Sequence, residues 1–242
     1  MELAPRSRSG LPPGGRTHLA RPPAGRQRYA TGQGSEWYAA RSVAFGGSAV
    51  YSVNLGSVCG PDSPLGEAAL RPPCRVLELG CGDKPLAPGM AADGFSVVAV
   101  DFSEEAVRQA SGSSGRRRGP GRVDYAAADV RALPFAGGSF GAVVDKGCFD
   151  ALRSAHCAQA LGEVCRVLQP GGRFVCISNA EQLLRAHARR VPGWSCVPGA
   201  PFVLAGVDDE VFLHCYRRLG HEACHARPSH DGPVFHHHHH QQ

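Results

Sequence analysis

Short apolar runs alternate with amphipathic segments through the middle of this chain. The runs are too short for helices and predict buried strands, whereas apolar residues at i, i+3, i+4 and i+7 over 158–168 predict a helix. Strands that alternate with helices indicate an α/β fold with a doubly wound, mostly parallel sheet. We predict strands at 76–79, 95–100, 123–127, 140–144 and 173–177, helices at 86–92, 104–110, 158–168 and 181–189, and an antiparallel C-terminal strand pair at 194–197 and 210–217, giving a seven-stranded sheet.

Capping and turn residues set several boundaries of these elements. Ser103 is a favourable N-cap, and the two acids that follow it suit the first turn of a helix. The Pro-Gly-Gly run at 170–172 is expected to end the helix before the fifth strand. Residues 60–73 are predicted to form a loop. Residues 111–122 are predicted to be a flexible linker, with contact to an acidic partner as the alternative.

Composition divides the chain into three parts. Residues 1–35 are rich in Pro, Gly, Arg and Ser, and we expect a disordered extension because they cannot bury enough surface to offset chain entropy. Residues 36–220 are predicted to form the functional domain, in which 36–58 complete the core or border the cleft. Residues 221–242 are predicted to be a flexible His-rich tail, and the five-His run at 236–240 is given no functional role.

The formal net charge of +5 comes from the extension. Residues 1–35 contain six arginines and one glutamate, whereas the rest of the chain has 20 basic and 20 acidic residues, so we expect no nucleic-acid partner. No apolar run approaches the roughly 20 residues that span a bilayer, so we expect no membrane partner. The ten cysteines contain no C-x-x-C pair, which favours a reducing, cytoplasmic location. The Arg-rich extension leaves mitochondrial or other organelle import as the alternative.

A glycine turn follows the first predicted strand. Gly80, Cys81 and Gly82 come directly after 76–79, and glycine lets a ligand approach the bare backbone because it has no Cβ. In an open α/β sheet, ligands bind outside the carboxyl ends of the strands. A dinucleotide site would need a third small residue for close helix packing, but Pro85 stands there and Asp83 would repel a phosphate. A phosphate-free, cationic adenosine ligand such as S-adenosylmethionine fits better.

Three acids follow three of the predicted strands. Asp101 comes 19 residues after Gly82, close to the spacing of a ribose-binding acid. Asp129 is placed to accept from an adenine amine, while the next backbone N–H can meet a ring nitrogen. Asp145 stands where the reacting end of the ligand is expected. A single acid after a strand is usually a turn former, but three at the same edge indicate a binding cleft.

These motifs resemble class I S-adenosylmethionine-dependent methyltransferases. VLELGCG is similar to their first motif, VVAVDFS to the second-strand motif, and VLQPGGRFVCIS to the fifth-strand motif, and the resemblance covers about residues 74–218. The segment DKGCFDAL at 145–152 is similar to D-K-G-T-x-D-A-L of the methyltransferase-like 13 group, which includes elongation factor 1-alpha lysine methyltransferases. The resemblance implies a Rossmann-like fold, S-adenosylmethionine as cofactor, and methylation of a lysine in a protein partner such as a translation factor or metabolic enzyme.

The resemblance also implies roles for individual residues. Glu78 would act through water on the methionine amine, Asp145 would orient the acceptor amine, and Lys146 would line the acceptor end, with a carboxylate pair or helix cap as its structural alternative. The implied cofactor-binding residues are Glu78, Gly80, Cys81, Gly82, Asp101, Phe102, Asp129, Val130 and Asp145, and the implied catalytic residues are Asp145 and Lys146.

Several features depart from the family or leave alternatives open. Cys148 replaces the usual Thr, and Asp83-Lys84 follow the glycine turn. Cys81 has no nearby histidine in the sequence, so a turn-filling residue is favoured over a nucleophile. The His/Cys cluster from 214 to 230 matches no zinc spacing, so we expect no metal. A small-molecule methyltransferase and a non-catalytic cofactor-binding module remain alternatives, and an oxidoreductase is the least favoured.

Overall fold

The computed structural model describes residues 56–59, 63–113, 119–178, 182–204 and 211–220 of the chain. The predictions for 1–35, for 36–55 and for the tail at 221–242 concern residues outside these ranges. The helices are α2 (Gly56–Cys59), the 3-10 helix η3 (Gly66–Ala68), α3 (Ala87–Ala92), α4 (Glu104–Ser113), α5 (Cys148–Ala151), α6 (Ser154–Val167) and α7 (Leu183–Ala188). The strands are β1 (Arg75–Leu79), β2 (Ser96–Asp101), β3 (Arg122–Ala127), β4 (Phe140–Lys146), β5 (Leu168–Ser178), β6 (Trp194–Cys196), β7 (Phe202–Val203) and β8 (Phe212–Arg218).

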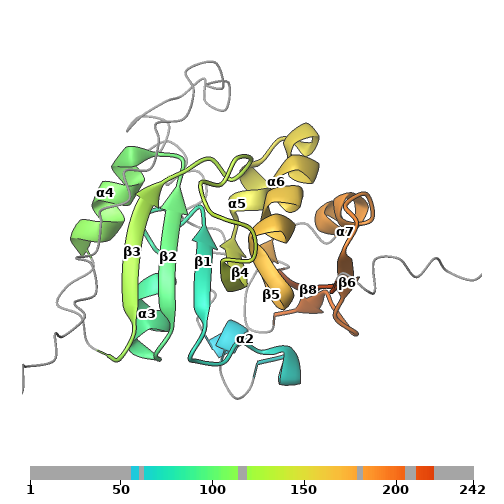
Figure 1. The fold of residues 1–242 in the computed structure, drawn as a ribbon, viewed down its shortest axis with the longest axis horizontal. Coiled ribbons are helices and arrows are strands. Elements are labelled where there is room, and N and C mark those ends of the chain that lie inside the picture. Colours follow the sequence, from blue (N-terminus) through green and yellow to red (C-terminus); the bar gives the residue numbers. More distant parts are fainter. Residues whose placement is uncertain (1–55, 60–62, 114–118, 179–181, 205–210, 221–242) are drawn as a thin grey trace, which may run out of the picture.

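These strands form one sheet with a parallel half and an antiparallel edge. The order is β3-β2-β1-β4-β5-β8-β6, and β7 pairs with β8 (Figure 1). The first five strands are parallel, whereas β8 runs antiparallel to β5, β6 and β7. The order reverses at β1 and β4, which is where an open α/β sheet binds its ligand. The predicted fold class is confirmed, with one additional short strand, β7.

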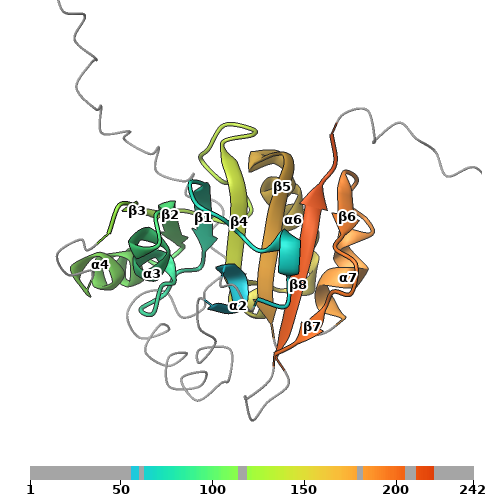
Figure 2. The same cartoon turned by 90° about the horizontal axis from the view of Figure 1, so that it is seen from below.

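Alternate residues of each strand supply two separate cores, one on each face of the sheet. Val76 belongs to the core that α2 and α3 cover with Val58 and Met90, whereas Leu77 belongs to the core under α6. Figure 2 shows α2 and α3 on one side of the strands and α6 on the other. The parallel strands are thus buried on both faces, which fits their nearly continuous apolar sequence.

Several predicted boundaries differ from the observed ones. Helix α6 begins at Ser154 and ends at Val167, and β5 begins at Leu168, so the Pro-Gly-Gly run at 170–172 lies inside the strand rather than between helix and strand. Opposite this run, the register of β4 against β5 shifts between Phe140, which pairs with Leu168, and Ala142, which pairs with Arg173. The predicted loop at 60–73 contains η3. By contrast, the predicted N-cap is confirmed, since the Ser103 hydroxyl accepts a hydrogen bond from the Ala106 N–H at 3.2 Å.

Candidate active site

The predicted site residues lie at the carboxyl ends of β1 to β4, along one edge of the sheet. The glycine turn at 80–82 is held between two neighbours. The Cys81 N–H donates to the Val100 carbonyl at 2.9 Å, and the Cys81 side chain is buried. Gly80 and Gly82 have φ of +57° and +55°, in the left-handed region that favours glycine. A Cβ at Gly80 would lie 2.6 Å from the Cys148 Cβ, so this turn is packed directly against the start of α5.

Glu78 lies beneath this turn and holds the segment that follows it. Its two carboxylate oxygens accept from the N–H groups of Leu86 and Ala87 at 2.7 and 2.9 Å. Glu78 is 1% exposed, and the loss of hydration raises its pKa to about 7, although both hydrogen bonds oppose this shift. Glu78 thereby fixes the start of α3. Its predicted action on a methionine amine stays a prediction.

Asp101 joins the glycine turn to the start of α4. Its Oδ2 accepts from the Gly82 N–H at 3.0 Å and its Oδ1 from the Ser103 N–H at 2.9 Å. Each oxygen of a carboxylate can accept a second hydrogen bond, so both remain suited to ribose hydroxyls. Desolvation raises the Asp101 pKa, and its backbone hydrogen bonds oppose that shift. The predicted contact of this half-buried acid with ribose hydroxyls stays a prediction. Phe102, beside it, is 42% exposed, as a flat apolar surface for such a ligand would be.

Asp129 is paired with an arginine that the sequence analysis did not single out. Arg131 donates from Nη2 to Asp129 Oδ2 at 2.8 Å and from Nε to Oδ1 at 3.0 Å, and the Arg131 N–H donates to Oδ1 at 2.9 Å. The two side chains are 10% and 6% exposed. An adenine amine would therefore share this carboxylate with Arg131. Val130 is buried, which leaves its backbone as the part suited to a ligand.

Asp145 points into the domain. It is 0% exposed and packs under α5. Its Oδ1 accepts from the Cys148 N–H at 2.7 Å, and its Oδ2 accepts from the Phe149 N–H at 3.2 Å and from the Cys176 thiol at 3.0 Å. Burial raises the Asp145 pKa to about 7. A contact with an acceptor amine stays a prediction, and it is one that this arrangement does not favour.

Lys146 points to the opposite face of the sheet from Asp145. Its Nζ donates to the Lys84 carbonyl at 2.8 Å, so it ties the end of β4 to the loop after the glycine turn. Desolvation lowers its pKa, and the nearby Glu78 carboxylate opposes that shift. This hydrogen bond is to a loop carbonyl, whereas the structural alternative was a carboxylate pair or a helix cap. Both that alternative and the catalytic role stay predictions.

Two residues were missed because their local sequence carries little or no signal. Cys176 lies within β5 in an apolar run, and only the pairing of Asp145 with Cys176 across β4 and β5 brings its thiol to that carboxylate. Arg131 follows Asp129 by two residues, a spacing that turns often use, and this was the one available signal.

Two observations on the described ranges concern metal ions and membranes. Among these residues, no group of three or more His, Cys, Asp or Glu is arranged to hold a metal ion. His214 is 1% exposed and Cys215 belongs to the core on the α3 side. The other members of the His/Cys cluster lie outside the described residues. No helix in the described part of the chain is long and apolar enough to cross a bilayer.

The sequence of this chain is similar to those of known methyltransferases. Residues 76–172 match the family described as "Methyltransferase domain". The chain is 36% identical over 145 residues to EEF1A lysine methyltransferase 4 of Bos taurus, which covers 53% of this chain and 56% of the bovine protein. It is also 39% identical over 105 residues to demethylmenaquinone methyltransferase of Beutenbergia cavernae, covering 43% of this chain and 40% of that protein. The chain thus spans about half the length of these relatives.

Solved structures agree on the fold. A chain from the Haloferax volcanii complex that contains the Trm112 methyltransferase activator superposes with a TM-score of 0.52 at 16% identity, covering 76% of this chain and 96% of that one. At this identity the likeness concerns the fold alone. Together with the family match, it confirms the resemblance to class I S-adenosylmethionine-dependent methyltransferases that the motifs indicated.

Proposed function

We propose that this protein is an S-adenosylmethionine-dependent methyltransferase that methylates a lysine side chain of a protein. The observation that carries the proposal is the agreement between the bovine lysine methyltransferase match and the site. The matched family region, 76–172, contains the glycine turn, Asp101 and the DKGCFDAL segment. A translation factor is the first substrate to test, because the bovine relative is an EEF1A lysine methyltransferase.

The residues of this chain suit such a reaction by alignment rather than by proton transfer. When bound, S-adenosylmethionine would supply a methyl group already activated on its sulfonium. Asp101 would hold the ribose hydroxyls while it also holds the Gly82 N–H, so ribose and turn are fixed by one carboxylate. Glu78 and Lys146 fix both ends of the segment that follows the turn. Positioning of this kind can supply much of the acceleration of a bimolecular step.

A transfer assay tests the proposal. The purified full chain would be incubated with S-adenosylmethionine carrying a labelled methyl group, first with purified eEF1A and then with cell extract. We expect label in a protein band that survives ester hydrolysis and that contains methylated lysine by mass spectrometry. Asp101→Ala should abolish most of this label, whereas Asp124→Ala, an exposed acid paired with Arg122 on β3, should not change it.

One observation favours a second candidate, a small-molecule methyltransferase. The match to demethylmenaquinone methyltransferase reaches 39% identity over 105 residues. Label that appears only in the small-molecule fraction of the extract would favour this candidate over the lysine proposal. A wild-type chain that binds neither S-adenosylmethionine nor S-adenosylhomocysteine at millimolar concentration would exclude both.

A further inference from the structure

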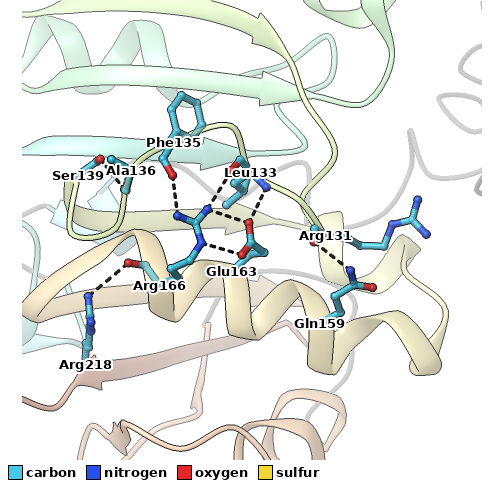
Figure 3. Close-up of polar contacts among 9 residues, drawn as sticks. All are labelled: Arg131, Leu133, Phe135, Ala136, Ser139, Gln159, Glu163, Arg166 and Arg218. Atoms are coloured by element: carbon cyan, nitrogen blue, oxygen red, sulfur yellow. Dashed lines mark hydrogen bonds and ion pairs between the residues drawn. The ribbon is translucent and has the colours of Figure 1, made fainter. Parts of the chain in front are cut away.

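Residues 129–139 form all but the first residue of the connection between β3 and β4, and they lie along the side of α6. They begin with Asp129 and Val130, the two residues predicted to hold adenine. Between Leu133 and Phe135 its backbone belongs to neither a helix nor a strand, so its polar groups need partners from elsewhere. Those partners come from α6, as Figure 3 shows.

Glu163 and Arg166 supply most of these partners. Glu163 Oε2 accepts from the Leu133 N–H at 2.7 Å, and Arg166 donates from Nη2 to the Leu133 carbonyl at 2.9 Å and from Nη1 to the Phe135 carbonyl at 2.6 Å. The two side chains also bond each other, with Arg166 Nε 2.8 Å from Glu163 Oε1 (Figure 3). One Glu–Arg pair therefore holds the loop backbone at three points.

Two further hydrogen bonds hold the loop on either side of this pair. Gln159 donates from Nε2 to the Arg131 carbonyl at 3.2 Å, and the Gly138 N–H donates to the Arg166 carbonyl at 3.0 Å. Phe135 adds an edge-to-face contact with Phe140, with ring centroids 5.1 Å apart. Helix α6 thus fixes the loop from Arg131 to Gly138.

Arg131 connects this loop to Asp129, one of the two residues predicted to hold adenine. The Arg131 backbone is fixed by Gln159, and its guanidinium is bonded to the Asp129 carboxylate. This ion pair is nearly buried, so it cannot separate without leaving a charge in a poorly hydrated environment. A displacement of Leu133 or Arg131 would therefore also displace Asp129 and the backbone of Val130.

A second Glu–Arg pair, on α4, bonds only within its own helix and so provides a comparison. Glu105 and Arg108 have the same i, i+3 spacing on α4 and also bond through two nitrogens of the arginine. The Arg108 side chain is 73% exposed, and the other partner of Glu105 is Gln109 on the same helix. Exposed ion pairs of this kind contribute little to stability. Glu163 and Arg166 differ because they also form hydrogen bonds with the backbone of the 129–139 loop.

We propose that Glu163 and Arg166 are positioning residues that hold the 129–139 loop in its adenine-binding conformation. The inference rests on the proposed S-adenosylmethionine-dependent function. A loop that is already ordered loses less conformational freedom when the ligand binds, so affinity is higher than for the same contacts on an unordered loop. The pair itself does not touch the reacting atoms.

Calorimetry on the full chain tests this with two ligands, S-adenosylhomocysteine and 5′-methylthioadenosine. Both contain adenine, but only the first contains the amino-acid portion. Arg166→Met removes the hydrogen bonds to Leu133 and Phe135, and should weaken both ligands by the same factor, roughly tenfold for two net hydrogen bonds. Glu163→Gln should weaken both by a smaller factor. Arg108→Met and Glu105→Gln are the matched controls and should leave both affinities unchanged.

The outcomes separate this proposal from general loss of structure and from the proposed function. A folded Arg166→Met variant with wild-type affinity for both ligands overturns the positioning role, as does a loss confined to S-adenosylhomocysteine. Equal losses in Arg166→Met and Arg108→Met overturn it as well. If Arg166→Met does not fold, Glu163→Gln decides by the same criterion. A wild-type chain that binds neither ligand overturns the proposed function together with this inference.

Discussion

Asp101 and Asp145 flank β1 from opposite sides, and they differ in depth by one residue. Leu79 pairs with Val100 on one side and with Asp145 on the other, so Asp145 is level with Val100 and Asp101 lies one residue farther toward the edge. Asp101 is half-buried and accepts from the N–H groups of Gly82 and Ser103, whereas Asp145 is 0% exposed and uses both oxygens inside the domain. One residue of depth thus accompanies a large difference in burial between the two acids, and the ribose-binding role of Asp101 stays a prediction.

The largest expected effect on stability is that of replacing Asp145, the more deeply buried of the two acids. Asp145→Ala would leave the N–H groups of Cys148 and Phe149 and the Cys176 thiol without their acceptor in a buried region. Each such loss costs about 1–3 kcal/mol, so the free energy of unfolding should fall by roughly 3 kcal/mol or more in denaturant titrations. A variant with wild-type stability but no methyl transfer would instead restore the direct catalytic role.

Replacing Asp101 should instead affect ligand affinity more than stability. Asp101→Ala should weaken S-adenosylhomocysteine binding by roughly tenfold to a hundredfold, because two charge-assisted hydrogen bonds to ribose are lost. The free energy of unfolding should fall less than in Asp145→Ala, since the two backbone donors lie at the edge of the sheet. Calorimetry and unfolding on the same preparation measure both quantities. Unchanged affinity would exclude the ribose role.

The pH dependence of stability sharpens the comparison further. Burial raises the Asp145 pKa from 3.8 to about 7, so the folded protein binds a proton that the unfolded chain has released. Its contribution to stability is fully present below the unfolded value and is lost as the pH rises through about 7. Between pH 5 and pH 8, the wild-type free energy of unfolding should therefore fall relative to that of Asp145→Asn. If the two fall in parallel, Asp145 is ionised throughout.

The smallest effect is expected at Lys146, which is level with Asp101 on the other side of β1. Lys146→Met removes the hydrogen bond to the Lys84 carbonyl but keeps much of the side-chain volume. Cofactor affinity should fall by no more than about tenfold, with kcat and its pH profile retained at saturating cofactor. A large loss of kcat at unchanged affinity would show that Lys146 is catalytic.

The sequence was sufficient for the parallel half of the sheet and for the position of Asp101 beside the glycine turn, because apolar runs and the glycine turn are local signals. The burial of Asp145 depends on the register of β4 against β1 and on α5, whose four residues are too few to show helical periodicity. The pairing of Arg131 with Asp129 depends on how the turn closes. Strand β7 has two residues and forms only because β8 lies beside it.

The close approach of Gly80 to Cys148 has a consequence for mutational scanning. A side chain at position 80 and the side chain at position 148 compete for one volume, so the tolerance of each position depends on the other. Shortening Cys148 to Gly would relieve the clash of Gly80→Ala but not its strained φ of +57°. Epistasis between these two positions should therefore be positive but incomplete, and single-site libraries will understate what position 80 can accept.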